Sequence, residues 1–235
     1  MRETGGAPMN ATARPASLIV GAGDGLSASL ARLLAGKGHA VFLAARNIEK
    51  LAPLCEAIGA EALRCDATDE GDVAALFEAI PSPSVVVYNP SYRVRGPLVE
   101  LAPAEVRKAI DITAFGAFLV AQQAAHRMLA KGTGTILFTG ASAGVKGYAQ
   151  SAPFAMGKFA LRGLAQSMAR ELHPKGIHIG HIVVDGGIRS AQRPDPGDNS
   201  MLDPDAIAQT YWSLIEQPRS AWSWEIEVRP WRETF

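Results

Sequence analysis

The chain has 235 residues, of which 48% are hydrophobic and 20% are charged, and this composition suits one α/β domain with a large core. Its 23 basic and 23 acidic residues balance, so the charge gives no sign of a nucleic acid or an anionic membrane as partner. No apolar run is long enough to span a membrane, and Cys55 and Cys65, the only cysteines, lack a partnering motif and indicate reduced thiols of a cytoplasmic protein.

The first 15 residues differ in composition from the rest of the chain. Residues 1–15 lack the apolar stretch of a signal peptide and are expected to form a flexible leader. Residues 16–235 show no linker, repeat or low-complexity tract, and we expect a single domain.

Strand and helix patterns alternate along this domain. Short apolar, β-branched runs predict seven strands, at residues 17–21, 40–45, 61–65, 84–88, 136–139, 177–184 and 225–228. Helical patterns lie between them and end at about residues 37, 58, 131, 173 and 217, the longest being 103–131 and 152–173. The alternation predicts a doubly wound, mainly parallel sheet of the Rossmann type.

A glycine-rich turn links the first strand to the first helix. Gly21, Gly23 and Gly25 let the backbone turn tightly and approach a phosphate, and the helix that begins near Leu26 offers free N–H groups. The turn therefore predicts a dinucleotide site, although a tight strand-to-helix turn without a ligand would look similar.

A second motif lies on the helix at 152–173. Phe154 and Lys158 are four residues apart and share one helix face. With the glycine turn, this surrounding sequence resembles the short-chain dehydrogenase/reductase family over roughly residues 17–229. The family patterns are Thr-Gly-x-x-x-Gly-x-Gly in the turn, where Val20 and Ser27 differ, and Tyr-x-x-x-Lys on the helix, where Phe154 replaces the tyrosine.

The resemblance implies a cofactor site built from several loops. After the second strand, where an acid would bind the ribose of NAD, the chain has Arg46, which favours NADP(H) over NAD(H) unless it is only an exposed loop residue. The remaining implied cofactor residues are Asp66 and Ala67 beside the adenine, Asn89 after the fourth strand, Lys158 at the nicotinamide ribose, and Gly186, Ile188 and Ser190 near the carboxamide.

The catalytic positions are mostly substituted. Of the four that the resemblance implies, Lys158 is retained, whereas Phe154 stands at the tyrosine, Ala141 at the serine and Thr113 at the asparagine. Phenylalanine has no ionisable proton, so the usual proton donor is missing. Ser142 and Tyr148 are candidate substitutes.

Three functions therefore stay open. The first is an NADP(H)-dependent oxidoreductase that acts on a small carbonyl or alcohol with a non-standard proton donor. The second is a catalytically weakened NADP(H)-binding sensor or partner subunit, and the third is a scaffold without cofactor. A lid is expected at about 189–203, the histidine spacing predicts no metal site, and the resemblance implies a homodimer or homotetramer.

Overall fold

A computed structural model describes residues 14–80, 82–190 and 193–233. Seven parallel strands form one sheet in the order β3-β2-β1-β4-β5-β6-β7, which confirms the predicted fold. The strands are β1 (Ala16–Val20), β2 (Ala40–Ala45), β3 (Glu61–Arg64), β4 (Val85–Tyr88), β5 (Gly134–Thr139), β6 (Ile177–Val184) and β7 (Glu225–Val228). The expected leader, residues 1–15, lies almost wholly outside the described residues.

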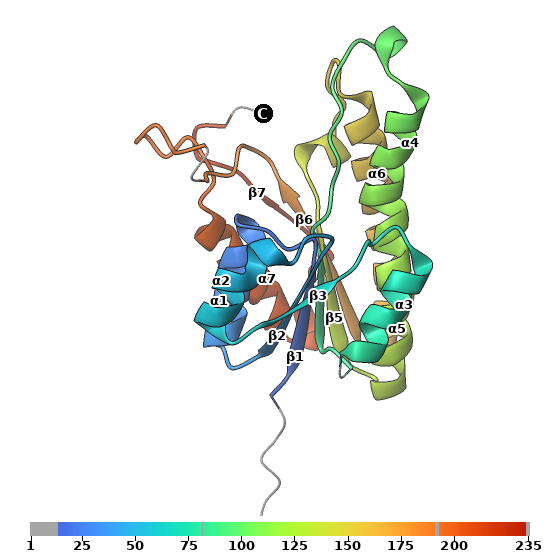
Figure 1. The fold of residues 1–235 in the computed structure, drawn as a ribbon, viewed down its shortest axis with the longest axis vertical. Coiled ribbons are helices and arrows are strands. Elements are labelled where there is room, and N and C mark those ends of the chain that lie inside the picture. Colours follow the sequence, from blue (N-terminus) through green and yellow to red (C-terminus); the bar gives the residue numbers. More distant parts are fainter. Residues whose placement is uncertain (1–13, 81, 191–192, 234–235) are drawn as a thin grey trace, which may run out of the picture.

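Helices cover both faces of the sheet. They are α1 (Leu26–Gly36), α2 (Ala52–Ile58), α3 (Glu70–Ala79), α4 (Pro103–Ile110), α5 (Gly116–Lys131), α6 (Ala152–Leu172) and α7 (Pro204–Ile215). One layer holds α1, α2 and α7, and the other holds α3, α4, α5 and α6 (Figure 1). In the part of the chain that is described, no helix has the length and apolar character needed to cross a bilayer.

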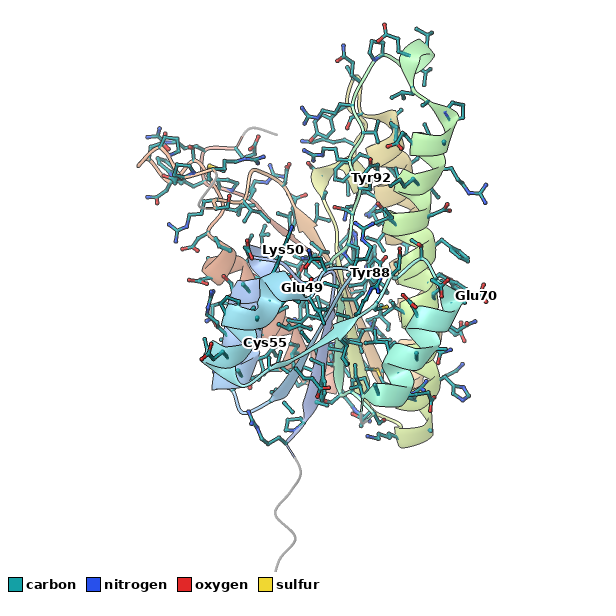
Figure 2. All side chains as sticks on the ribbon, viewed as in Figure 1. Glu49, Lys50, Cys55, Glu70, Tyr88 and Tyr92 are labelled. Atoms are coloured by element: carbon teal, nitrogen blue, oxygen red, sulfur yellow. The ribbon has the colours of Figure 1, made fainter. Side chains whose placement is uncertain are left out.

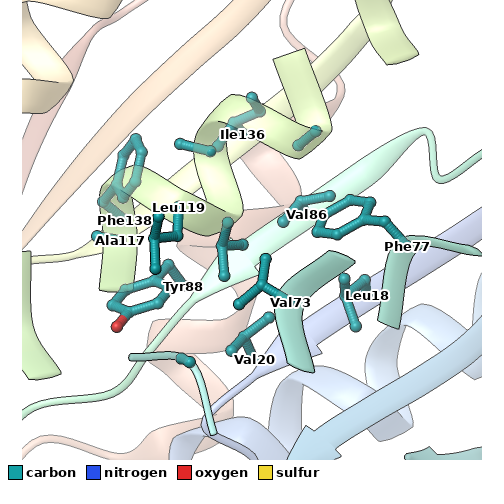
Figure 3. Close-up of a cluster of buried hydrophobic side chains, with 14 of the residues drawn as sticks. Leu18, Val20, Val73, Phe77, Val86, Tyr88, Ala117, Leu119, Ile136 and Phe138 are labelled. Carbon is teal, nitrogen blue, oxygen red and sulfur yellow. The ribbon is translucent and has the colours of Figure 1, made fainter. Parts of the chain in front are cut away.

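The core divides into two clusters because strand side chains alternate between the two faces. On β1, Leu18 and Val20 belong to the cluster under α3, α5 and α6, whereas Ile19 belongs to the cluster under α1 and α7. Figure 3 shows the first cluster, with Val73 and Phe77 of α3 packed towards the strands. Full burial on both faces explains why the strands appear in the sequence as continuous apolar runs.

Capping residues fix the ends of two helices. The carboxylate of Asp69 caps α3 by accepting a hydrogen bond of 2.8 Å from the amide of Asp72. Gly59 ends α2 in the left-handed conformation. The expected bounds are one or two residues too long at the ends of β3, α1 and α7, where the regular hydrogen bonding stops earlier.

The long helix expected at 103–131 is interrupted. A π-helical turn (Asp111–Phe115) separates α4 from α5. At this turn the Tyr88 hydroxyl donates to the carbonyl of Ile112 over 2.5 Å. A Cβ at Gly116 would lie 2.6 Å from the same hydroxyl oxygen, so the absence of a side chain there allows the helix to approach β4 closely.

Candidate functional site

The carboxyl ends of the strands meet at the edge of the sheet where the chain order reverses. β1 pairs with β2 on one side and with β4 on the other, and this is where ligands bind in open α/β sheets. Three adjoining cavities lie there. We call them the outer cavity, whose lining includes Arg46, the inner cavity, whose lining includes Lys158, and the side chamber, whose lining includes Tyr148.

The glycine turn lines the inner cavity. Gly21 has φ +78°, and a Cβ there would lie 2.6 Å from Pro90, so only glycine fits this position. A Cβ added at Gly23 or Gly25 would meet no atom within 4 Å, so both glycines border open space. Helix α1 begins directly after Gly25 without a side-chain cap, which leaves its first amides available to an anion.

Ser27 ties this turn to the next strand. Its hydroxyl donates to the carbonyl of Gly21 over 3.3 Å and accepts a hydrogen bond of 2.7 Å from the side-chain amide of Asn89. Ser27 therefore crosslinks the loops after β1 and β4 and fixes the floor shared by the inner and outer cavities.

Two cations stand at the outer cavity. Arg46 follows β2 and Lys50 lies in the short turn before α2, and both line this cavity together with Asp66 and Ala67. Figure 2 shows Lys50 on the α2 side of the sheet. The amide of Thr68 donates to the Asp66 carboxylate, and this hydrogen bond, with the charge of Arg46, lowers the pKa of Asp66.

Lys158 lies at the inner end of the cleft. Its side chain is 2% exposed, and its ammonium nitrogen donates to the carbonyl of Thr139 over 2.6 Å. Burial, together with the positive charge of Arg93, lowers the pKa of Lys158 to about 7. Lys158 is therefore poised to change protonation near neutral pH.

The ring of Phe154 separates the inner cavity from the side chamber. It is 5% exposed and lines both spaces. The guanidinium carbon of Arg93 lies 4.2 Å from the ring centroid, and the ammonium nitrogen of Lys158 lies 5.8 Å from it. Arg93 also lines both spaces, so a guanidinium and the Lys158 amine flank an aromatic ring that has no proton to donate.

A polar cluster supports the cleft from behind. Glu225 of β7 accepts two hydrogen bonds from Arg162 of α6, at 2.6 and 2.7 Å, and contacts the Nδ1 atom of His181 at 3.0 Å. Burial lowers the pKa of His181 to about 4, so this ring is neutral near pH 7. A Cβ at Gly140 would lie 2.4 Å from the ring, which packs the start of the loop after β5 tightly against β6.

The family model described as short chain dehydrogenase matches residues 16–194. The chain belongs to this family. A crystal structure of a short-chain dehydrogenase from Rhodopseudomonas palustris is 38% identical, with a TM-score of 0.81, and the alignment covers 93% of this chain and all of that one. The family consists of NAD(P)-binding oxidoreductases.

Other members give a wider comparison. A metagenomic short-chain oxidoreductase solved in complex with NADP is 27% identical, with a TM-score of 0.82, over 93% of this chain and 98% of that one. Cis-4-hydroxycyclohexanecarboxylate dehydrogenase of Sinomonas cyclohexanicum is 32% identical over 73% of each chain. An uncharacterized oxidoreductase of Staphylococcus aureus strain N315 is 25% identical over 91% of this chain and 96% of that one.

The structure brings the expected cofactor residues of this family member together. All of them line the inner or the outer cavity: Gly21, Gly23, Gly25, Leu26, Arg46, Asp66, Ala67, Asn89, Lys158, Gly186, Ile188 and Ser190. Within the described ranges, no three potential metal ligands gather at one point, and the absence of a metal site stays a prediction.

The residues at the expected catalytic positions, and their candidate substitutes, do not all lie in one cavity. Ala141 and Phe154 line the inner cavity, whereas Ser142 and Tyr148 line the side chamber. Thr113 is fully buried in the π turn, where its hydroxyl accepts a hydrogen bond of 3.4 Å from the amide of Tyr92. Thr113 therefore packs behind the cleft.

Sequence reasoning missed two of the cations that line the inner and outer cavities, Lys50 and Arg93. Lys50 could have been found, because it stands four residues after Arg46 in a short connection. Arg93 lies in an irregular segment after β4, where no periodicity indicates the direction of a side chain.

Proposed function

We propose that the chain is an NADP(H)-dependent oxidoreductase that transfers a hydride between the cofactor and a small carbonyl or alcohol, with a non-standard proton donor. The observation that carries the proposal is the continuous line of twelve expected cofactor residues along two adjoining cavities. The S. cyclohexanicum relative, whose name describes a dehydrogenase of a hydroxy compound, supports this reaction class.

The preference for NADP(H) rests on charge. Arg46 and Lys50 both line the outer cavity, where a 2′-phosphate on the adenosine ribose would extend. A guanidinium can bind such a phosphate through two parallel hydrogen bonds, and the second cation adds to the attraction. The metagenomic relative solved with NADP supports the same preference.

Different residues would bind the cofactor and supply the proton. The nicotinamide, when bound, supplies or accepts a hydride. The open first turn of α1 would hold the pyrophosphate, and Lys158 would bind the ribose and, in its protonated form, place a positive charge beside the reacting oxygen. Ser142 and Tyr148 face the side chamber and are candidates to guide a proton from water, because Phe154 has none.

A second function is favoured by the same substitutions. Phe154 and Ala141 both line the inner cavity, so the wall that carries a tyrosine and a serine elsewhere in the family is apolar here. A protein that binds NADP(H) and reports its presence, without turnover, fits this wall. Such a protein would bind cofactor as tightly as the enzyme but would oxidise no NADPH with any carbonyl compound.

A titration with NADPH and NADH tests the cofactor proposal. We expect NADPH to bind at least about tenfold more tightly, and we expect Arg46→Ala to remove most of that difference, because a charge-assisted pair contributes on the order of 1.5–3 kcal/mol. Arg32→Ala, at an exposed arginine of α1, is the matched control and should change neither affinity. Equal losses for both cofactors in Arg46→Ala would show that Arg46 does not read the phosphate.

We also propose a homodimer or homotetramer joined through α5 and α6. Phe118 of α5 and Met156 and Phe159 of α6 are 41%, 50% and 45% exposed, which is a large apolar area for two neighbouring helices. A second copy would cover it. Phe118→Glu with Phe159→Glu should shift the sedimentation coefficient to that of a monomer, and an unchanged coefficient would contradict this interface.

We place the activity in the cytoplasm. Both cysteines are free, and burial raises the pKa of the Cys65 thiol to about 12, which keeps it unreactive. Free, inert thiols are typical of proteins from a reducing compartment.

A further inference from the structure

The side chamber is a cavity of about 640 Å³ beside Phe154, and three arginines line it. Arg93 and Arg95 come from the segment after β4, which a hydrogen bond of 3.1 Å between the Gly96 amide and the Gln150 carbonyl holds against the loop before α6. Arg193 comes from the loop after β6, where its backbone pairs with Ser190 at 2.8 and 3.1 Å. Three separate cations therefore meet at one cavity.

These arginines lack acidic partners. Among the described residues, no carboxylate lies within ion-pair distance of Arg93, Arg95 or Arg193, whereas Arg162 and Arg189 each pair with an acid. Partial desolvation of the otherwise exposed Arg93, together with the positive charges of Arg95 and Arg193, lowers the pKa of Arg93, as expected for like charges held together. An anion in the chamber would relieve this repulsion.

The acidic residues of the chamber do not cancel this charge. Asp185 lies 3.3 Å from Arg229 and 3.7 Å from Lys146, so its carboxylate is already balanced by two other cations. Glu233 is exposed at the rim. The chamber therefore keeps an excess of positive charge next to the proposed hydride-transfer site.

We propose that the substrate is an oxo acid or hydroxy acid whose carboxylate binds Arg95 and Arg193 in the side chamber, while Arg93 faces the reacting oxygen. This inference rests on the proposed function. Of the three arginines, Arg93 is the one that lines both spaces, and its guanidinium lies over the ring of Phe154, which occupies the position of the family tyrosine. An arginine holds a carboxylate through two parallel hydrogen bonds, which suits Arg95 and Arg193 to the anionic end.

The chemistry balances without a phenol. In the reducing direction, a hydride and its electron pair reach the carbonyl carbon, a C–H bond forms, and the electrons of the C=O π bond move to the oxygen. The Arg93 guanidinium stabilises that oxyanion by hydrogen bonding and stays protonated, because its pKa is too high for proton transfer. A water molecule from the open chamber gives the proton, and the resulting hydroxide is neutralised by solvent.

A matched pair of ligands tests the anionic site without requiring turnover. Levulinate and its methyl ester differ in one charge, and each is titrated into protein saturated with NADP⁺. We expect the acid to bind at least about tenfold more tightly than the ester, because hydrogen bonds to charged groups are roughly twice as strong as neutral ones. In Arg95→Gln with Arg193→Gln the ratio should fall to about two or less.

Two further variants sharpen the result. Arg170→Gln removes an exposed arginine of α6 outside the three cavities and should keep the full preference for the acid. Arg93→Gln should lower kcat for levulinate by about 100-fold and change its KM by less than about threefold, because the loss falls on the transition state. A merely structural role of Arg93 would change both constants or the stability.

The outcomes separate this inference from the function on which it rests. Equal binding of acid and ester, no binding of levulinate by protein that binds NADPH, or a preference that survives in Arg95→Gln with Arg193→Gln would overturn the inference and leave the oxidoreductase proposal intact. A protein that binds no NADPH refutes the proposed function before any acid is added, and the inference falls with it.

Discussion

Replacing Lys158 with methionine should remove a pH dependence of stability that the wild-type chain shows between pH 7 and pH 10. The side chain is 2% exposed, and burial lowers the pKa of Lys158 from 10.5 to about 7. Between these values the unfolded chain holds the proton and the folded chain has lost it. Stability therefore rises with pH, because the state that binds more protons is favoured at low pH.

The magnitude follows from the two pKa values. Each pH unit within the window adds at most about 1.4 kcal/mol to the free energy of unfolding, and integration from pH 7 to pH 9 gives about 2 kcal/mol. Below pH 7 both states are protonated, so this contribution no longer changes and the full cost of the buried charge stays in the folded protein. Lys158→Met cannot bind a proton, so its stability lacks this rise.

Urea unfolding followed by tryptophan fluorescence at pH 7 and pH 9 measures the effect. For each protein we take the difference between the free energies of unfolding at pH 9 and pH 7. The value for Lys158→Met is then subtracted from the value for the wild type, because the contributions of the other titrating groups cancel in this subtraction. Lys175→Met, at a lysine whose side chain is 51% exposed, is the control and should follow the wild type. A difference below about 0.5 kcal/mol would show that Lys158 is solvated and charged, and would refute the reasoning.

Two further predictions concern the walls of the cleft. Gly21→Ala places a side chain at a backbone φ of +78° and against Pro90, so we expect the free energy of unfolding to fall by about 2–3 kcal/mol and NADPH to bind more weakly. Gly36→Ala, at a helix position where a Cβ meets only open space, is the control and should not lower the stability measured by thermal unfolding. Phe154→Tyr with Ala141→Ser should raise the rate of any NADPH-dependent carbonyl reduction by about 100-fold or more in steady-state assays, because general acid catalysis contributes a factor of this size. Unchanged turnover in the folded double variant would contradict the assignment of Phe154 and Ala141 to the tyrosine and serine positions of the family.

The fold could be predicted from the sequence because its strands are buried on both faces. Continuous apolar runs such as 40–45 and 84–88 leave little choice but a parallel sheet covered by helices, and the order of elements then gives the connections. The cofactor residues could be found for a related reason. They stand at the carboxyl ends of strands, and the strands bring those ends together.

The substrate side could not be predicted in the same way. Arg93, Arg95 and Arg193 lie in irregular segments, and the segment of Arg93 and Arg95 is held against the loop before α6 by a hydrogen bond between residues far apart in the sequence. The separation of Thr113 from the cleft was equally hidden, because the apolar pattern of a helix continues through the π turn. Local pattern predicts elements well, but it carries little information on side chains whose position is set by long-range contacts.

The π turn also fixes the number of residues in this part of the chain. A π turn is equivalent to one residue inserted into an α-helix, and it sets α4 and α5 in different rotational phases. Removing Ala114 would restore a regular helix but would rotate one half against the other by about 100°. Either α5 would turn Ala117 and Ala121 away from the sheet, or α4 would turn Ala109 away from α6. A surface helix usually tolerates substitution and sometimes shortening, but here a single deletion between two correctly folded halves would leave one of them facing the wrong partner.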